Sequence, residues 1–161
     1  MTASARQADI AQLVRMVAPD STVSEQLKAV HDLLRIPDRL SAKAAKVSAT
    51  TIRRWRSEDT DDPSEGLENL RVVVAEIAET GQKSPRAIGS WLRSRNRALG
   101  FERPLDLVAT ADAETIGWII EAGIAFANSY SLPEGSPQGT AIPAGSSDLG
   151  GRFGKTRQPI P

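Results

Sequence analysis

The sequence predicts an all-α protein, a small helical bundle followed by a disordered C-terminal tail. Apolar residues recur at helical spacing through most of the first 130 residues. Serine and aspartate in capping positions, and prolines at helix starts, mark where these stretches begin. Half of the prolines and half of the glycines lie beyond residue 130, where large apolar side chains are few. The chain is therefore expected to be ordered and helical first, and unstructured at its end.

The N-terminal part predicts a short helix and then a second helix. Apolar residues at 8–17 are spaced for a helix, which Pro19 interrupts, within an extension at residues 1–22. Ser24 is the expected cap of the second helix. Its apolar stripe ends before Pro37, which fixes the expected end of the helix.

The middle of the chain predicts two short helices and one long one. The apolar pattern restarts at Asp38 and continues, after a cap at Ser48, into the run ATTIRRWRS, which indicates two helices joined by a tight turn. Pro63 and Glu65 open the long helix. Gly81 is its expected C-terminal stop, because glycine readily adopts the left-handed conformation that ends helices.

Three further helical elements are expected before the tail. Ser84 caps the first and Pro85 opens it, Pro104 starts a short helical turn, and Asp112 caps a long last helix. Five apolar residues of the last helix are spaced for burial: Ile116, Ile119, Ile120, Ile124 and Phe126. Residues 131–161 cannot bury enough apolar surface to offset their chain entropy, so we expect them to be disordered.

Residues 40–58 have the pattern of a helix-turn-helix. Ala42 or Ala45 supplies the small residue needed where the two helices cross. The apolar residues expected to hold the second helix down are Val47, Ile52 and Trp55. Two positions depart from the motif: Ser41 stands where an apolar residue is usual, and Lys46 stands where the turn prefers glycine.

This segment is also the one clearly basic stretch of a chain with 20 basic and 20 acidic residues. No acidic residue falls between Arg39 and Arg56. Threonine and arginine at the start of a second helix can reach DNA bases or phosphates. The candidate DNA-binding residues are Lys43, Lys46, Ala49, Thr50, Thr51, Arg53, Arg54 and Arg56. The alternative is a solvated basic face on an ordinary helical hairpin.

The C-terminal helical region carries a series of short motifs in a fixed order. These are Trp91-Leu92, Asn96, Leu99-Gly100, the run PLDL from Pro104, and GIAFA from Gly123. In this order the region resembles the toxin-binding domain of the Xre/MbcA/ParS antitoxin family. In that family the domain follows a Xre-like helix-turn-helix, as it does here, and the resemblance covers roughly residues 24–130.

The resemblance implies a division of the chain and a set of partners. It implies a Xre-like DNA-binding region at residues 23–82 and a toxin-binding module at 83–130. Family members typically neutralise a RES-domain toxin that consumes NAD, and repress their own operon by binding its promoter. They tend to block the toxin with residues at or near the C-terminus, which here points to residues 125–130 and the tail that follows. The candidate partner-binding residues are Asn96, Arg97, Phe101, Pro104, Phe126 and Tyr130.

The composition gives little support to an enzyme. The chain has no cysteine, a single histidine at His31, and no glycine-rich phosphate loop, so we expect no catalytic role, metal or cofactor. The N-terminus mixes charges into its apolar residues and no stretch is long enough to span a membrane, so a cytoplasmic protein is expected. A homodimer is expected because one such module reads only a half-site.

Two other functional classes stay open at this stage. One is a free-standing transcriptional regulator that uses its C-terminal module to dimerise or to bind an unrelated partner. The other is an adaptor without DNA binding. The charge pattern of the module is lopsided, with basic residues clustered between Lys83 and Arg103 and only acidic ones from Asp106 to Glu121. One interpretation is that the basic part contacts DNA or an acidic partner surface and the acidic part contacts a basic pocket of a partner. The other is that both are ordinary solvated helix faces.

Overall fold

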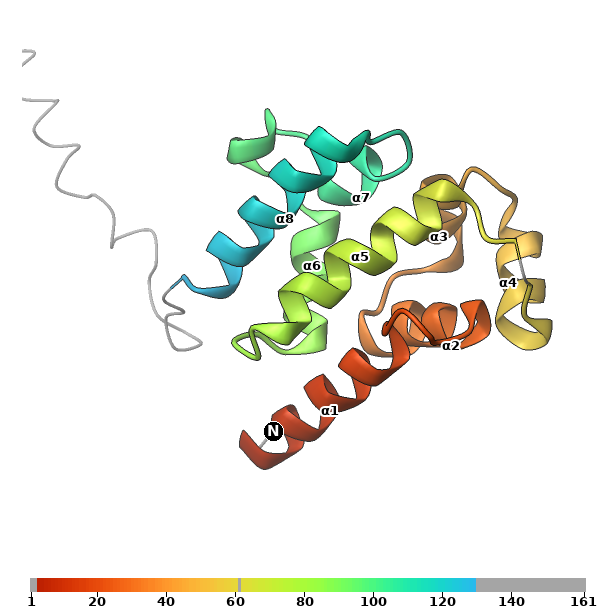
Figure 1. Cartoon of the computed structure of the whole chain (residues 1–161), viewed down its shortest axis with the longest axis horizontal. Helices are drawn as coiled ribbons and strands as arrows, with labels where there is room; N and C mark the ends of the chain where they lie inside the picture. Colours follow the sequence, from red (N-terminus) through yellow and green to blue (C-terminus); the bar gives the residue numbers. More distant parts are fainter. Residues whose placement is uncertain (1–2, 61, 130–161) are drawn as a thin grey trace, which may run out of the picture. The chain divides into compact units, whose positions relative to one another are not determined.

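The computed structural model describes residues 3–60 and 62–129, which form an all-α bundle as predicted (Figure 1). Within these ranges there is no strand, only an isolated bridge between Asn96 and Glu102. The predicted disorder of residues 131–161 concerns a segment outside the described residues. The α-helices of the described part are α1 (Ala3–Met16), α2 (Val23–Lys28), α3 (Asp38–Ala45), α4 (Ala49–Glu58), α5 (Glu65–Glu79), α6 (Pro85–Arg93), α7 (Pro104–Leu107) and α8 (Ala113–Ala127). A π-helical turn, η1 (Ala29–Leu33), continues α2, and a 3-10 turn, η2 (Arg97–Leu99), follows α6.

Most helix starts follow the capping signals in the sequence. The side chains of Ser48, Ser84 and Asp112 each accept a hydrogen bond from a backbone N–H in the first turn of α4, α6 and α8. Ser64 does the same for α5, so Pro63 lies just before the cap and not inside the helix. Gly81 follows the end of α5 with a positive φ of 67°, which confirms it as the stop.

The cap of α2 differs from the prediction. It is Thr22, whose hydroxyl accepts from the Glu25 backbone N–H while the Glu25 carboxylate accepts from the Thr22 N–H, a complete capping box. Ser24 is buried instead. Its N–H donates to the Asp59 carboxylate at 2.9 Å and its hydroxyl to the Arg56 carbonyl at 2.5 Å, so it joins α2 to the end of α4.

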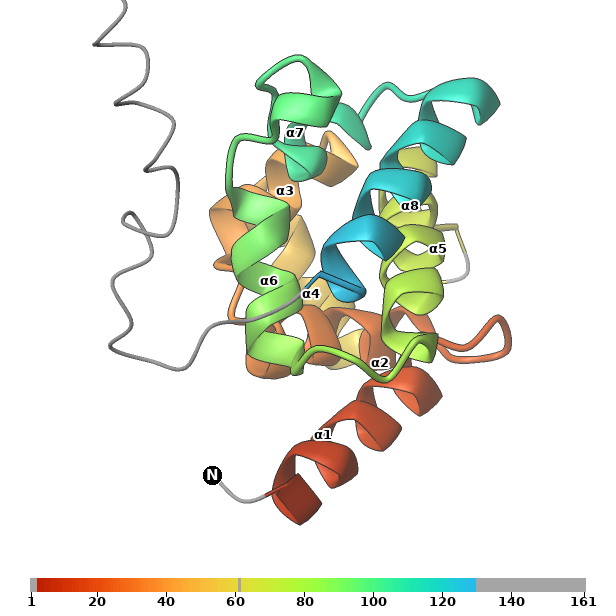
Figure 2. The ribbon, with the colours of Figure 1, turned by 90° about the vertical axis from the view of Figure 1, so that its left-hand side faces the viewer.

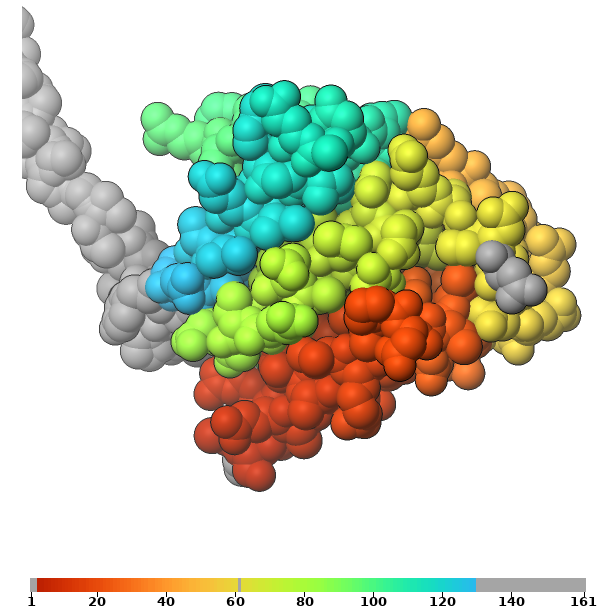
Figure 3. All heavy atoms as spheres, in the orientation of Figure 1, coloured from red at the N-terminus to blue at the C-terminus, as the bar shows by residue number. Residues whose placement is uncertain are grey.

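The long helix α5 lies at the centre of the bundle and contacts α1, α3, α6 and α8. Figure 2 shows α8 running beside α5, and Figure 3 shows α1, α5 and α8 as successive bands on one face. Five apolar side chains of α5 are almost completely buried: Leu67, Leu70, Val73, Val74 and Ile77. The regions predicted as separate, residues 23–82 and 83–130, therefore contribute to one hydrophobic core.

Two glycines allow helices to approach unusually closely. A Cβ atom added to Gly66 of α5 would lie 2.0 Å from the Ala44 carbonyl oxygen of α3. A Cβ added to Gly89 of α6 would lie 1.8 Å from the Leu34 carbonyl oxygen, which follows η1. Only glycine fits where a neighbouring backbone lies this close. Gly89 thus fixes the C-terminal helices against the N-terminal part of the bundle.

Candidate functional site

Helices α3 and α4 are joined by a tight turn, as the sequence predicts. The turn consists of Lys46, Val47 and Ser48, and the Val47 N–H donates to the Ala42 carbonyl at 3.0 Å. Lys46 adopts the left-handed conformation with φ 60° and ψ 41°. Glycine is favoured at this position because it adopts the left-handed conformation without steric strain. Lys46 adopts it as well, and its side chain is an exposed cation beside the start of α4.

The residues predicted to hold α4 in place do contact the core. Ile52 is buried, and Val47 and Trp55 are partly buried against it. Ala42 and Ala45 are both buried at the packing of α3 on α4. Ser41, which stands where the motif usually has an apolar residue, is only 1% exposed and is therefore buried as an apolar residue would be.

The candidate DNA-binding residues divide into exposed and engaged groups. Thr50, Arg53 and Arg54 are exposed on α4, as are Lys43 and Lys46 beside it. Ala49 and Thr51 are half-buried, and the Thr51 hydroxyl lies 3.0 Å from that of the cap, Ser48. The exposed face of α4 is therefore narrower than the sequence indicates.

Arg56 was expected to be exposed, but it is paired with a carboxylate. Its guanidinium donates through both terminal nitrogens to Asp38 at the start of α3, one of the two bonds being 3.2 Å. Its side chain is 22% exposed and that of Asp38 is 15% exposed. Arg53 lies 3.9 Å from the same carboxylate. The spacing along one chain gave no signal that Asp38, 18 residues earlier, would face Arg56.

This pairing makes the stability of the α3–α4 unit depend on pH. The Arg56 hydrogen bond, with weaker contributions from the nearby His31 and Arg53 charges, holds the pKa of Asp38 below its ordinary value. An acid with a lowered folded-state pKa stabilises the fold above its unfolded pKa, about 3.9, and this stabilisation is lost as the pH falls through the folded value.

We therefore expect Asp38→Asn to lower the free energy of unfolding by about 1.5 kcal/mol at pH 7, because the variant cannot form the charged pair. The difference from wild type should shrink below about pH 4, where wild-type Asp38 also becomes neutral. Denaturant unfolding at pH 7 and pH 3 measures this. Asp20→Asn, at an exposed position outside the pair, is the control, and an equal loss in both variants at pH 7 would contradict the assignment.

The C-terminal part presents a compact loop between α6 and α7. The Asn96 side chain accepts from the Ala98 N–H at 2.8 Å, and its backbone pairs with Phe101 and Glu102. Phe101, with φ 66°, has its side chain 60% exposed, and Arg97 is exposed beside it. Asn96 thus shapes a loop that displays Phe101.

The other candidate partner-binding residues have different surroundings. Pro104 is buried at the first position of α7. Phe126 is half-buried: its ring stacks on Trp91 with centroids 5.6 Å apart, and the Lys83 ammonium lies 5.3 Å from the ring centroid. Tyr130 lies outside the described residues.

Helix α8 is less buried than its apolar spacing predicts. Of the five residues expected in the core, only Ile119 is buried, and Ile116, Ile120, Ile124 and Phe126 are partly exposed. The reason is that α8 contacts mainly α5 and η2. Its apolar residues occupy a wider part of the helix surface than these two elements cover.

Sequence reasoning missed one large exposed apolar side chain of this helix. Trp118 is 57% exposed and lines a shallow cavity of about 260 Å³. We call its lining the Trp118 patch: Ala98, Trp118, Glu121, Ala122 and Ala125. Trp118, Ala122 and Ala125 recur at a spacing of four and three residues, the stripe that predicts one helix face. That stripe was the available signal.

The described residues offer no other obvious chemistry. Among residues 3–60 and 62–129 there is no group of three or more histidine, cysteine or acidic side chains that could hold a metal ion. No helix in the same ranges is long and apolar enough to cross a membrane. Two exposed features stand out: the basic α3–α4 unit, and the exposed aromatic residues Phe101 and Trp118 of the C-terminal part.

Comparison with known proteins finds a partial match. The chain is similar to a protein described as a probable antitoxin. Over 69 residues it is 35% identical to a protein of Mycobacterium tuberculosis described as a probable mycobacterial cidal antitoxin. The match covers 42% of this chain and 58% of that protein. No family model and no solved structure matches the chain.

Proposed function

We propose that this protein is the antitoxin of a type II toxin–antitoxin system, which binds and neutralises a protein toxin and binds promoter DNA of its own operon. The observation that carries the proposal is the pair of unlike surfaces on one small bundle: exposed cations on α4 and an exposed apolar patch on α8. The similarity to a protein described as an antitoxin favours this function over others that use such surfaces.

The DNA-binding role rests on the α3–α4 unit acting as a helix-turn-helix. Its second helix displays Thr50, Arg53 and Arg54, and Lys43 and Lys46 flank it. Hydroxyl and guanidinium groups on such a helix suit base edges and phosphates in the major groove. Because one copy reads only a half-site, we propose that the protein binds as a homodimer.

The toxin-binding role rests on the C-terminal part of the bundle. Large exposed aromatic side chains, surrounded by smaller apolar ones, are typical anchors of protein interfaces. Trp118 is exposed beside three alanines, Phe101 is a second exposed aromatic side chain, and both belong to the segment that resembles a toxin-binding domain. We propose a RES-domain toxin that consumes NAD as the partner, with the antitoxin itself free of catalytic activity.

The decisive experiment is co-expression of the tagged protein with the product of its neighbouring gene. A stoichiometric complex in which the partner's NAD consumption is suppressed supports the antitoxin. A complex without suppression, or no complex, contradicts it. If promoter DNA is still bound in that case, the protein is a free-standing regulator, and size-exclusion chromatography with light scattering then tests whether the Trp118 patch makes a dimer.

For DNA binding, we expect Arg54→Ala to weaken affinity for the promoter duplex by about 1–3 kcal/mol, the usual loss for a base-contacting arginine. Arg54 is exposed, so folding should be unchanged. A salt-controlled mobility-shift assay measures the effect. Arg15→Ala removes an equally exposed cation from α1 and is the matched control. Equal affinities for Arg54→Ala and wild type would count against α4 as the reading helix.

A further inference from the structure

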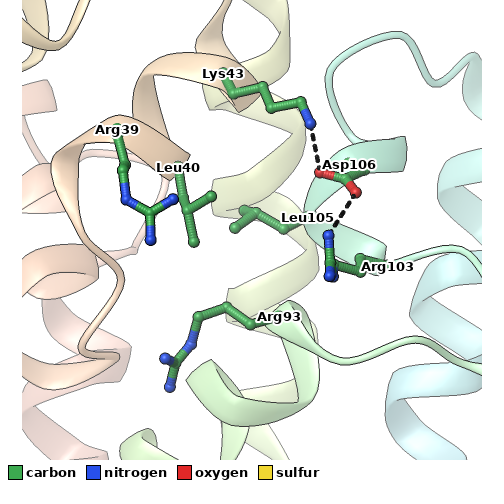
Figure 4. Close-up of a pocket in the computed structure, with 7 residues that line it drawn as sticks. All are labelled: Arg39, Leu40, Lys43, Arg93, Arg103, Leu105 and Asp106. Atoms are coloured by element: carbon green, nitrogen blue, oxygen red, sulfur yellow. Dashed lines mark ion pairs between the residues drawn. The ribbon is translucent and has the colours of Figure 1, made fainter.

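A basic pocket lies where α3 meets the C-terminal helices, outside the exposed face of α4 (Figure 4). It has a volume of about 200 Å³. Helix α3 contributes Arg39, Leu40 and Lys43; the C-terminal part contributes Arg93, Arg103, Leu105 and Asp106. Four cationic side chains and one carboxylate therefore line this space.

Ion pairs inside the protein compensate this charge only weakly. Lys43 and Arg103 share Asp106, at 3.6 Å and 3.7 Å, near the outer limit of an ion pair. Arg93 donates through Nε to the Gly89 carbonyl, which leaves its two terminal nitrogens directed elsewhere. The Arg39 side chain takes part in none of the ion pairs within residues 3–60 and 62–129. Three positive charges remain in excess of the one carboxylate, and an anion is the ligand that such a pocket favours.

The position of the pocket indicates which anion. Helix α3 pairs with Arg53 and Arg56 of α4 through Asp38, and it lines the pocket through the next residue, Arg39. In a helix-turn-helix the first helix crosses the DNA backbone while the second enters the groove. A backbone phosphate would thus pass beside α3 when α4 reads DNA.

We propose that this pocket receives a DNA backbone phosphate, which makes Arg93 and Arg103 of the C-terminal part members of the nucleic-acid interface. The inference rests on the proposed DNA-binding function of α4. Asp106 then has a distinct role: it holds Lys43 and Arg103 in place and, as a negative charge at the pocket, lowers the affinity for DNA. Phosphate contacts add affinity without reading sequence.

The test compares full-length variants on two duplexes, one covering the region upstream of the gene and one of random sequence and equal length. We expect Arg93→Gln with Arg103→Gln to weaken binding to both duplexes by a similar factor and to reduce the slope of log affinity against log salt by about 1. Asp106→Asn should strengthen binding to both. The matched control is Arg15→Gln with Arg86→Gln, which removes two exposed charges outside the pocket. Thermal unfolding checks that each variant folds.

The outcomes separate this inference from the function on which it rests. If wild type binds neither duplex, both the DNA-binding function and the inference are wrong. If wild type binds and Arg54→Ala weakens it, but the Arg93/Arg103 variant keeps the wild-type salt slope, only the pocket assignment is wrong. The last measurement is a titration of the wild-type protein with inorganic phosphate, followed by NMR. If phosphate binds at the pocket but the Arg93/Arg103 variant binds DNA as tightly as wild type, the pocket is a site for a free anion and the proposal is wrong.

Discussion

Replacing Gly89 with alanine is expected to destabilise the protein by about 3 kcal/mol, because the new methyl group would overlap the Leu34 carbonyl oxygen. A backbone oxygen cannot rotate away as a side chain can. Helix α6 would have to move outward, which would loosen the packing of Ile88 and Leu92, both fully buried. For a domain of this size the melting temperature should fall by roughly 10 °C, as measured by circular dichroism.

A second glycine of the chain provides the control for this experiment. A Cβ atom at Gly117 in α8 meets nothing within 4 Å, so Gly117→Ala should stabilise the helix by up to about 1 kcal/mol. The two variants make the same chemical change with opposite expected signs. If Gly89→Ala melted at or above the wild-type temperature, the close approach of α6 to Leu34 would be contradicted.

Replacing Trp118 with alanine is expected to weaken the complex with the partner protein by at least about 2 kcal/mol, roughly 30-fold, if the Trp118 patch is the toxin-binding surface. A tryptophan at the centre of an interface loses a large contact area when it is truncated. Because its side chain is 57% exposed in the free protein, the melting temperature should change little. Isothermal titration calorimetry with the purified partner measures the loss.

The comparison variant for Trp118 is Glu114→Ala, an exposed residue one turn earlier on α8. We expect it to bind the partner as wild type does. Equal affinities for all three proteins would remove the Trp118 patch from the interface and return attention to Phe101 and the residues after Ser129.

The sequence predicted well the features that depend on a few neighbouring residues. Caps at Ser48, Ser84 and Asp112, and the stop at Gly81, are local hydrogen-bond or backbone preferences, and the structure confirms them. The N-terminal helix was predicted at residues 8–17 but begins at Ala3, since nothing local marks its start.

The features that the sequence did not predict depend on contacts between distant residues. Ser24 has the composition of a cap, yet its hydroxyl binds the Arg56 carbonyl 32 residues away, and Thr22 takes the capping role. In the same way, Arg56 pairs with Asp38, 18 residues earlier, and is therefore not exposed as the other arginines of α4 are. The pocket at Arg39 and Arg93 needs two helices from different parts of the chain, so no motif in the sequence could indicate it.

The apolar residues of α8 also depend on distant contacts that the sequence does not reveal. Helical spacing identifies which residues share a face, but not how much of that face a neighbour covers. Ile119 is enclosed, whereas Ile116 and Ile120 remain partly open. Whether an apolar stripe serves the core or a partner is decided by tertiary packing.

The contacts of α5 with both α3 and α8 mean that no linker separates the two proposed binding surfaces. A protein bound to α8 would therefore have one fixed position relative to DNA bound along α4. A flexible linker between the two surfaces would instead allow many relative positions. Two copies bound to half-sites one turn of DNA apart would then hold their partners at a single defined spacing. The distance between half-sites in the promoter would thereby decide sterically which protein assemblies can form on it.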